Sequence, residues 1–146
     1  MKKLLILIML SPFILAGQIV VDKLDCDKTG DVLFVIKNTD TINYFVSLEI
    51  EIMHDSTWCL VDNNILAPSS SKMECWIMLK SKLSETIQFN INDILKSASV
   101  FIPTISTYLK PSQKDNEFRI KVNYTSLLGE KNEHIYCKFT VPRDFR

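Results

Sequence analysis

The clearest pattern in the chain is an alternation of apolar and polar side chains between residues 42 and 53. Apolar residues hold the even positions, while Phe45, Ser47, Glu49 and Glu51 stand between them. Successive side chains of a β-strand point to opposite faces, so this period of two predicts a long strand with one wet face. The buried face would carry Ile42, Tyr44, Val46, Leu48, Ile50 and Ile52.

The same alternation, or a run of β-forming residues, recurs along the rest of the chain. These segments are residues 18–25, 31–37, 72–80, 87–91, 118–124 and 135–141. Seven or eight strands are therefore expected. Short turns suit antiparallel strands, whereas parallel strands need crossover connections of about a dozen residues or more. The pattern predicts an all-β fold, an antiparallel β-sandwich.

Residues 92–116 form the least regular part of the chain and include Pro103 and Pro111. Asn92 is suited to cap a short helix that ends before Pro103. One face of this helix would carry Ile94, Leu95, Ala98 and Phe101. We expect an irregular or short helical insertion around residues 92–116.

The first seventeen residues have the features of a secretory signal peptide. Lys2 and Lys3 precede an apolar run from Leu4 to Ala16, and small residues end the segment. This run is shorter than the roughly 20 residues that span a bilayer. We therefore expect residues 1–17 to be removed, residues 18–146 to form one domain, and no stable membrane anchor to remain. The short lysine start is typical of bacteria, which predicts a periplasmic or secreted protein.

All four cysteines lie in the part of the chain that would be exported. An even number of cysteines in an oxidising compartment favours disulfides over free thiols. Four cysteines allow three pairings, and the sequence alone does not choose among them. We favour Cys59 with Cys75, which would join neighbouring strands, and Cys26 with Cys137, which would join the first strand to the last.

Composition argues against several classes of function. The chain has 17 basic and 17 acidic side chains, so it lacks the clustered positive charge that nucleic acids require. Its three glycines are too few for a loop that cradles phosphates, which argues against nucleotide cofactors. No cofactor and no nucleic-acid partner are expected.

Candidate chemical sites are weak. His54 with Cys59, and His134 with Cys137, have spacings that suit a soft metal ion. Disulfide formation would remove the cysteine ligands, so no metal site is expected. Ser69 and Lys72 have the spacing of a serine–lysine catalytic pair, but that pair requires a helix start and this one leads into a strand. We expect no catalytic residues and no enzyme.

Three segments carry a resemblance to the bacterial immunoglobulin-like domains of exported proteins. Residues 31–38 followed by Thr39–Thr41 and a long strand resemble the B to C hairpin of those domains. The residues Ile65–Pro68, followed by Lys72, resemble their next segment. Phe118–Tyr124, a turn with Gly129, and His134–Val141 resemble their F to G hairpin. The resemblance implies an immunoglobulin-like sandwich and assigns no functional residue.

The alternation also predicts one surface on which a partner could bind. If the long strand lies beside the last two strands, their outward side chains share a face that combines aromatic rings with complementary charges. This partner face would consist of Phe45, Glu49, Glu51, Arg119, Lys121, Tyr136 and Lys138. Aromatic side chains of this kind are enriched at interfaces. The competing interpretation is a solvated charge ladder with incidental aromatic residues.

The function expected from these features is binding without catalysis, with another envelope or surface protein as the partner. Three alternatives remain open. A structural subunit of a surface or pilus-like assembly would present an exposed edge strand and associate with itself. A small periplasmic inhibitor or immunity protein would form a tight one-to-one complex. An enzyme or metal carrier would show a cleft with converging polar groups.

Overall fold

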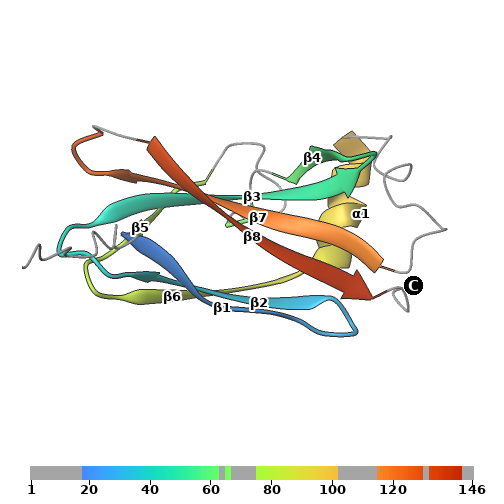
Figure 1. Ribbon diagram of the computed structural model, residues 1–146, viewed down its shortest axis with the longest axis horizontal. Coiled ribbons are helices and arrows are strands. Elements are labelled where there is room, and N and C mark those ends of the chain that lie inside the picture. Colours follow the sequence, from blue (N-terminus) through green and yellow to red (C-terminus); the bar gives the residue numbers. More distant parts are fainter. Residues whose placement is uncertain (1–17, 63–64, 67–74, 102–114, 130–131, 143–146) are drawn as a thin grey trace, which may run out of the picture.

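The protein folds into two antiparallel sheets that face each other, with one helix at an end (Figure 1). The computed structural model describes residues 18–62, 65–66, 75–101, 115–129 and 132–142. Within these residues the elements are β1 Ile19–Cys26, β2 Asp31–Asn38, β3 Tyr44–His54, β4 Thr57–Asp62, β5 Ile77–Leu79, β6 Ser84–Asn90, α1 Ile91–Phe101, β7 Asp115–Ser126 and β8 Asn132–Pro142. The predicted antiparallel β-sandwich is confirmed.

The smaller sheet has three strands in the order β1-β2-β6. β1 and β2 form a hairpin, and a register shift between Val21 and Lys23 interrupts their pairing. At the hairpin turn, the Asp27 carboxylate accepts hydrogen bonds from the amides of Thr29 (2.8 Å) and Asp31 (3.0 Å). These bonds form the turn between the two segments that were expected as strands at residues 18–25 and 31–37.

The larger sheet has five strands in the order β4-β3-β7-β8, and β5 also pairs with β3. β4 pairs with residues 50–54 of β3 and β5 with residues 44–46, so both lie along the same edge of β3. On the other edge, β3 pairs with β7 from Tyr44 opposite Ser126 to Ile52 opposite Phe118. β3 is therefore the strand around which this sheet is built.

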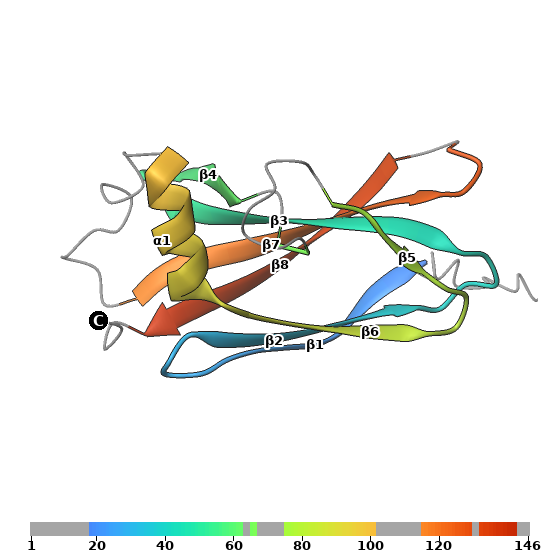
Figure 2. The same ribbon diagram turned by 180° about the vertical axis from the view of Figure 1, so that it is seen from behind.

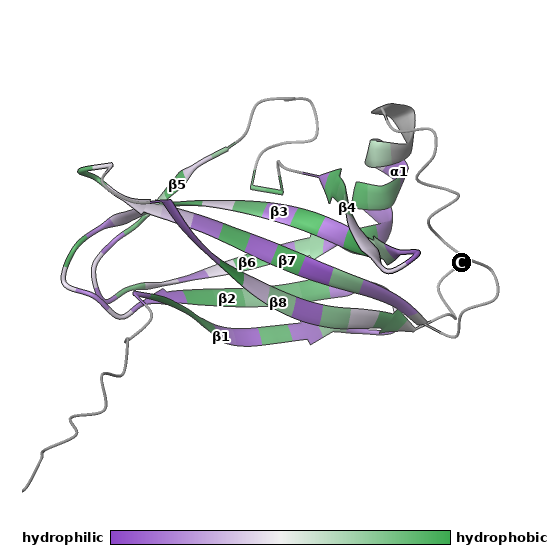
Figure 3. Ribbon diagram, turned by 45° about the horizontal axis from the view of Figure 1, so that its top comes forward, coloured by the Kyte–Doolittle hydropathy of each residue, from purple (hydrophilic) through white to green (hydrophobic). Residues whose placement is uncertain are grey.

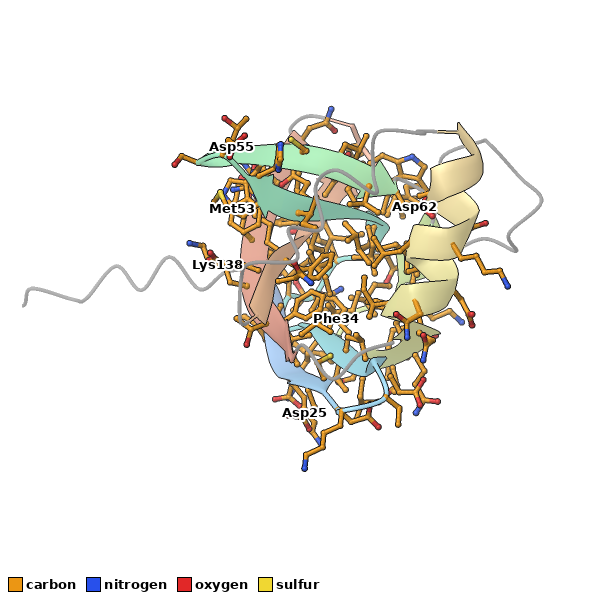
Figure 4. All side chains as sticks on the ribbon, turned by 90° about the vertical axis from the view of Figure 1, so that its right-hand side faces the viewer. Asp25, Phe34, Met53, Asp55, Asp62 and Lys138 are labelled. Carbon is orange, nitrogen blue, oxygen red and sulfur yellow. The ribbon has the colours of Figure 1, made fainter. Side chains whose placement is uncertain are left out.

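The alternation read from the sequence separates the core from the surface. Tyr44, Val46, Leu48, Ile50 and Ile52 of β3 are buried, as the pattern predicts. The sheets interdigitate through side chains such as Phe34, which Figure 4 shows between the layers. Hydrophobic and hydrophilic residues alternate along the strands in Figure 3. Burial of these apolar side chains is the main stabilising contribution.

Helix α1 lies at one end of the sandwich and packs against β4 and β6 (Figure 2). Ala98 is buried, and Ile94 and Leu95 pack partly against the core. The short helix expected from Asn92 onward is thus present, although it begins at Ile91. Residues 102–114 of the expected insertion lie outside the described residues, and β7 already begins at Asp115.

Some predicted boundaries were wrong. Ile42 lies in the connection before β3 and is exposed, because the strand begins at Tyr44. Ile91 starts the helix instead of extending the strand before it. Of the strand expected at 72–80, the described part is strand only in β5, Ile77–Leu79. β4 was not predicted, because its alternation is short and it follows a turn without glycine.

Residues 1–17, the expected signal peptide, lie outside the described residues, as do Ser69 and Lys72. In the described part of the chain, no helix has the length and hydropathy needed to cross a bilayer.

Candidate functional site

The outer face of the five-stranded sheet brings six of the seven predicted face residues together. Glu51 lies opposite Arg119, and Arg119 lies opposite Lys138 on the next strand. The neighbouring row consists of Glu49, Lys121 and Tyr136. β3, β7 and β8 therefore lie side by side in one sheet, as the sequence predicted.

Arg119 is enclosed by two aromatic rings. Its guanidinium carbon lies 4.4 Å from the centre of the Trp58 ring and 4.0 Å from that of Tyr136. Its Nε donates a hydrogen bond to Oε2 of Glu51. The side chains of Arg119 and Glu51 are only 17% and 14% exposed. We call Trp58, Arg119 and Tyr136 the aromatic centre; cation–π contact and charge pairing hold its arginine in one orientation.

A second pair of charges extends the network along the sheet. Lys121 Nζ donates to Oε2 of Glu49 at 3.0 Å, and this bond raises the pKa of Lys121. Asn123 donates to Oε1 of Glu49 (2.9 Å) and to the hydroxyl of the buried Ser47 (3.4 Å). A cross-strand charge ladder is thus present. The side chains of its two central ion pairs are 14–25% exposed, whereas that of Lys138 is 63% exposed.

Exposed side chains surround the aromatic centre. Tyr136 itself is 44% exposed, and Leu60, which pairs with Glu51, is 45% exposed. Lys138 Nζ lies 5.5 Å from the Trp58 ring centre and 3.6 Å from a carboxylate oxygen of Glu117. In Figure 4, Lys138 projects from this outer face together with Met53. Exposed aromatic and apolar surface bordered by charges is typical of protein interfaces.

Sequence reasoning missed Trp58. It contacts Arg119 only because β4 folds back on β3, and β4 was not predicted. The alternation of Trp58 and Leu60 after the two-residue turn Asp55–Ser56 was the signal that could have revealed this hairpin.

Phe45 does not belong to the aromatic centre. It pairs with Met78 and Thr125 at the other end of β3. Four residues of extended strand separate it from Glu49, a distance of about 13 Å. Trp76 and Met78 are both exposed in the structure.

The structure contains neither expected disulfide, and all four cysteines are free. Cys59 lies opposite Ile52, whereas Ile77 lies opposite Val46. The six residues of β3 from Val46 to Ile52 span about 20 Å. Cys75 precedes Ile77 by two residues, which shortens this distance by at most about 7 Å. The remaining separation exceeds the roughly 7 Å between Cα atoms that a disulfide tolerates.

Cys26 and Cys137 belong to different sheets and pack partly against the core. Burial raises the pKa of both thiols, and the neighbouring carboxylates of Asp27 and Asp31 add to this effect at Cys26. A raised pKa lowers the thiolate fraction, so these two cysteines behave as small apolar residues with low reactivity.

Each of the two histidines contacts a neighbouring protein side chain. His54 Nε2 lies 3.3 Å from Oδ2 of Asp55, and the ring of His134 stands edge-on to Tyr136 with centres 5.1 Å apart. His134 is exposed while Cys137, three residues later, packs toward the core, so their side chains point to opposite faces. No group of three or more potential metal ligands occurs among the residues that the structure describes.

An open cleft of about 590 Å³ lies beside the β1–β2 turn. Several of its carboxylates are already engaged, because Asp25 pairs with Lys23 at 2.9 Å and Asp31 accepts a hydrogen bond from Asn90 at 2.8 Å. The Thr29 hydroxyl and the Asp31 amide hold the pKa of Asp27 below its ordinary value. These groups stabilise the turn. The cleft is lined by Asp25, Asp27, Asp31, Val32, Leu33, Gln88, Phe89 and Asn90.

Comparison with known proteins adds only a distant likeness. No protein-family model matches the chain, and no curated protein matches its sequence. Among solved structures, the chain is similar to a crystal structure of a protein from Archaeoglobus fulgidus, with 13% sequence identity and a TM-score of 0.34. The match covers 84% of this chain and 90% of the archaeal one.

Proposed function

We propose that the chain is an exported bacterial protein with an immunoglobulin-like domain that binds another envelope or surface protein without catalysis. The proposed binding site is the outer face of the five-stranded sheet. The observation that carries this proposal is the aromatic centre, in which Trp58 and Tyr136 hold Arg119. Tryptophan, tyrosine and arginine are the residues most enriched at binding hot spots. Here they are ordered before any partner arrives, which reduces the entropy lost on binding.

The strand order supports the immunoglobulin-like part of the proposal. In such sandwiches, strands A, B and E share one sheet and strands C, F and G share the other. Here β1, β2 and β6 form one sheet, while β3, β7 and β8 form the other with β4 beside β3. β4 then corresponds to the extra strand that variable-type domains add next to strand C.

The arrangement of charges favours binding over catalysis. On the proposed face, Glu49 and Glu51 are paired with Lys121 and Arg119, and the pairs neutralise each other. In the cleft beside the β1–β2 turn, the acidic side chains hold the turn together. Polar groups that already pair with one another are better suited to a binding surface than to catalysis.

Site-specific photo-crosslinking in the native cells tests the proposal. A photoreactive residue at Leu60, beside the aromatic centre, is expected to capture one envelope protein. The same residue at Thr86, exposed on β6 in the opposite sheet, should not. Tyr136→Ala should reduce capture to roughly a tenth, because truncation of a hot-spot residue costs at least that factor. Equal capture from both positions, or capture unaffected by Tyr136→Ala, would contradict the proposal.

Strand β8 favours a second candidate, a structural subunit that assembles through strand addition. β8 is the last strand of its sheet, and none of the described strands pairs with its outer edge. An open edge of this kind accepts an additional strand. In the same experiment, a subunit would be crosslinked to further copies of itself, whereas an inhibitor or immunity protein would give a one-to-one complex with a different protein.

A further inference from the structure

Strand β6 is an edge strand without the features that usually protect such an edge. It pairs with β2 on one side, and none of the described strands pairs with its other side. Its register with β2 is unbroken, and it contains no proline, no lysine and one charged residue, Glu85. Figure 2 shows it between α1 at one end and the β5–β6 connection at the other. Natural sheets protect their edges with charges, prolines or bulges, so this edge is suited to pair with another chain.

The other sheet edges differ from β6 in this respect. The register of β1 shifts between Val21 and Lys23, and the side chain of Lys23 is 52% exposed on that strand. β8 has β1 of the other sheet packed beside it and ends at Pro142. β4 and β5 have only six and three residues. Among the described strands, β6 alone offers a regular edge of seven residues with none of these features.

The hydrogen bonds to β2 show which backbone groups of β6 point outward. At one end of the pairing, the Asn38 amide donates to the carbonyl of Leu83 at 2.9 Å. At the other end, the Ile91 amide donates to the carbonyl of Gly30, also at 2.9 Å. Because hydrogen-bonded and non-hydrogen-bonded positions alternate along an antiparallel pair, the odd-numbered residues of β6 bond to β2. The residues whose amides and carbonyls point outward are Ser84, Thr86, Gln88 and Asn90.

The charges along β2 and β6 indicate a second copy of the chain as the occupant of this edge. Outward amides and carbonyls at strand spacing fit an extended backbone. β2 carries Asp31 opposite Asn90 and Lys37 opposite Ser84, so the two ends of the β2–β6 pair have opposite charges. Antiparallel pairing about a two-fold axis would place residues 84–90 opposite residues 90–84 of the second copy. Lys37 would then lie in the same row across the sheet as Asp31 of the second copy.

The same register creates no unfavourable pair. Glu85, the one charged residue of β6, would lie opposite Phe89, and Ile87 would lie opposite Ile87 of the second copy. Like charges directly opposite each other destabilise a sheet, and the seven paired positions contain none. Leu83, which is 54% exposed just before β6, would lie beside the start of α1 of the second copy. Its apolar surface would be removed from water there. The strand is therefore complementary to itself.

We propose that two copies of the chain pair through β6 in antiparallel orientation and join their three-stranded sheets into one continuous sheet. Because paired strands share the two faces of a sheet, both five-stranded sheets would lie on the same side of the joined sheet. The dimer would therefore present two aromatic centres on one side. This interface lies in the other sheet from the proposed binding face and does not depend on the proposed function.

Sedimentation equilibrium and hydrogen exchange of the full chain test the pairing together. As the concentration rises, the mass should change from 16.8 kDa to twice that value. Over the same range, exchange at the amides of Thr86 and Gln88 should slow by about tenfold once about 90% of the chains are paired, because only unpaired chains exchange there. The amide of Ile87, which already bonds to β2, should change much less. A doubled mass with unchanged exchange at Thr86 and Gln88 would overturn the proposal, as would a monomer at every concentration.

Two substitutions at one position separate the backbone contact from the side chain. Thr86→Pro removes an outward amide and no hydrogen bond to β2, so it should weaken dimerisation by at least about tenfold. Thr86→Ala keeps this amide and should dimerise like the unchanged chain. Circular dichroism verifies that both variants are folded, and the exchange of the unchanged chain decides the question if Thr86→Pro is not. A folded Thr86→Pro protein that dimerises as well as Thr86→Ala would also overturn the proposal.

Photo-crosslinking separates this proposal from the proposed function. A photoreactive residue at Thr86 should link the chain to a second copy, whereas the same residue at Leu60 is expected to capture an envelope protein. Either result can be obtained without the other, because the two positions lie in different sheets. Failure at Thr86 alone would overturn the β6 dimer and leave the binding face unaffected.

Discussion

Arg119 shows why the type of cation matters on this sheet. A planar guanidinium can lie flat against two rings while its Nε binds a carboxylate, whereas a lysine ammonium has no plane to stack. Trp58, Tyr136 and Glu51 provide those three contacts from three different strands. A single side chain thus ties β4, β7, β8 and β3 together.

The hydroxyl of Tyr124 provides a pH-dependent test at the residue scale. Burial, and then the hydrogen bond to Glu133, raise the pKa of Tyr124 to about 12. An unfolded tyrosine ionises near pH 10, so between pH 10 and 12 the folded chain holds the proton more strongly than the unfolded chain. Its contribution is complete below pH 10 and disappears as the pH rises through 12.

Over that interval the free energy of unfolding should fall on account of Tyr124, by at most about 1.4 kcal/mol per pH unit. Tyr124→Phe removes this proton, so its urea unfolding curves should lose less stability between pH 10 and 12 than those of the unchanged chain. Parallel losses in the two proteins would show that Tyr124 already ionises in the folded state.

At the scale of elements, the period of two predicted most of the sheet framework and the neighbourhood of β3, β7 and β8. It failed where local geometry carries little sequence signal. β4 was missed because its turn uses Asp55 and Ser56, both with positive φ, in place of the usual Asn-Gly pair. The aromatic centre was then incomplete, since Trp58 stands on that strand. Periodicity could not test the two cysteine pairs, because the register along β3 sets the separation of Cys59 from Cys75, and the assignment of β1 and β8 to different sheets sets that of Cys26 from Cys137.

The same turn leads to a prediction about stability. Ser56 has a φ of 65°, a conformation that costs a residue with a Cβ atom more than it costs glycine. Ser56→Gly should raise the free energy of unfolding by about 0.5–1 kcal/mol. Denaturant titration measures the change, and Thr57→Gly, within the strand, is the control that should be destabilising. A destabilised Ser56→Gly protein would mean that the turn has another geometry.

At the scale of the whole molecule, Cys26 and Cys137 lie in different sheets, and the register along β3 separates Cys59 from Cys75. The structure predicts four free thiols when the protein is denatured without reductant and alkylated. In the folded protein, Cys26 and Cys137 should react at least about tenfold more slowly than after unfolding, because burial raises their pKa and limits access. Peptide mapping of the alkylated protein measures both. A peptide that links Cys26 to Cys137 would instead restore the disulfide expected from the sequence.

The position of β3 between β4 and β7 also has a kinetic consequence. Its pairing with β7 joins residues far apart in the chain, such as Glu51 and Arg119, which are 68 positions apart. Folds dominated by such distant pairings assemble slowly, in about milliseconds to seconds. Until residues 115–126 are available, β3 has only the short strands β4 and β5 as partners. During synthesis from the N-terminus, the larger sheet therefore stays incomplete until the last quarter of the chain has been made. A chain truncated before Asp115 would never complete this sheet.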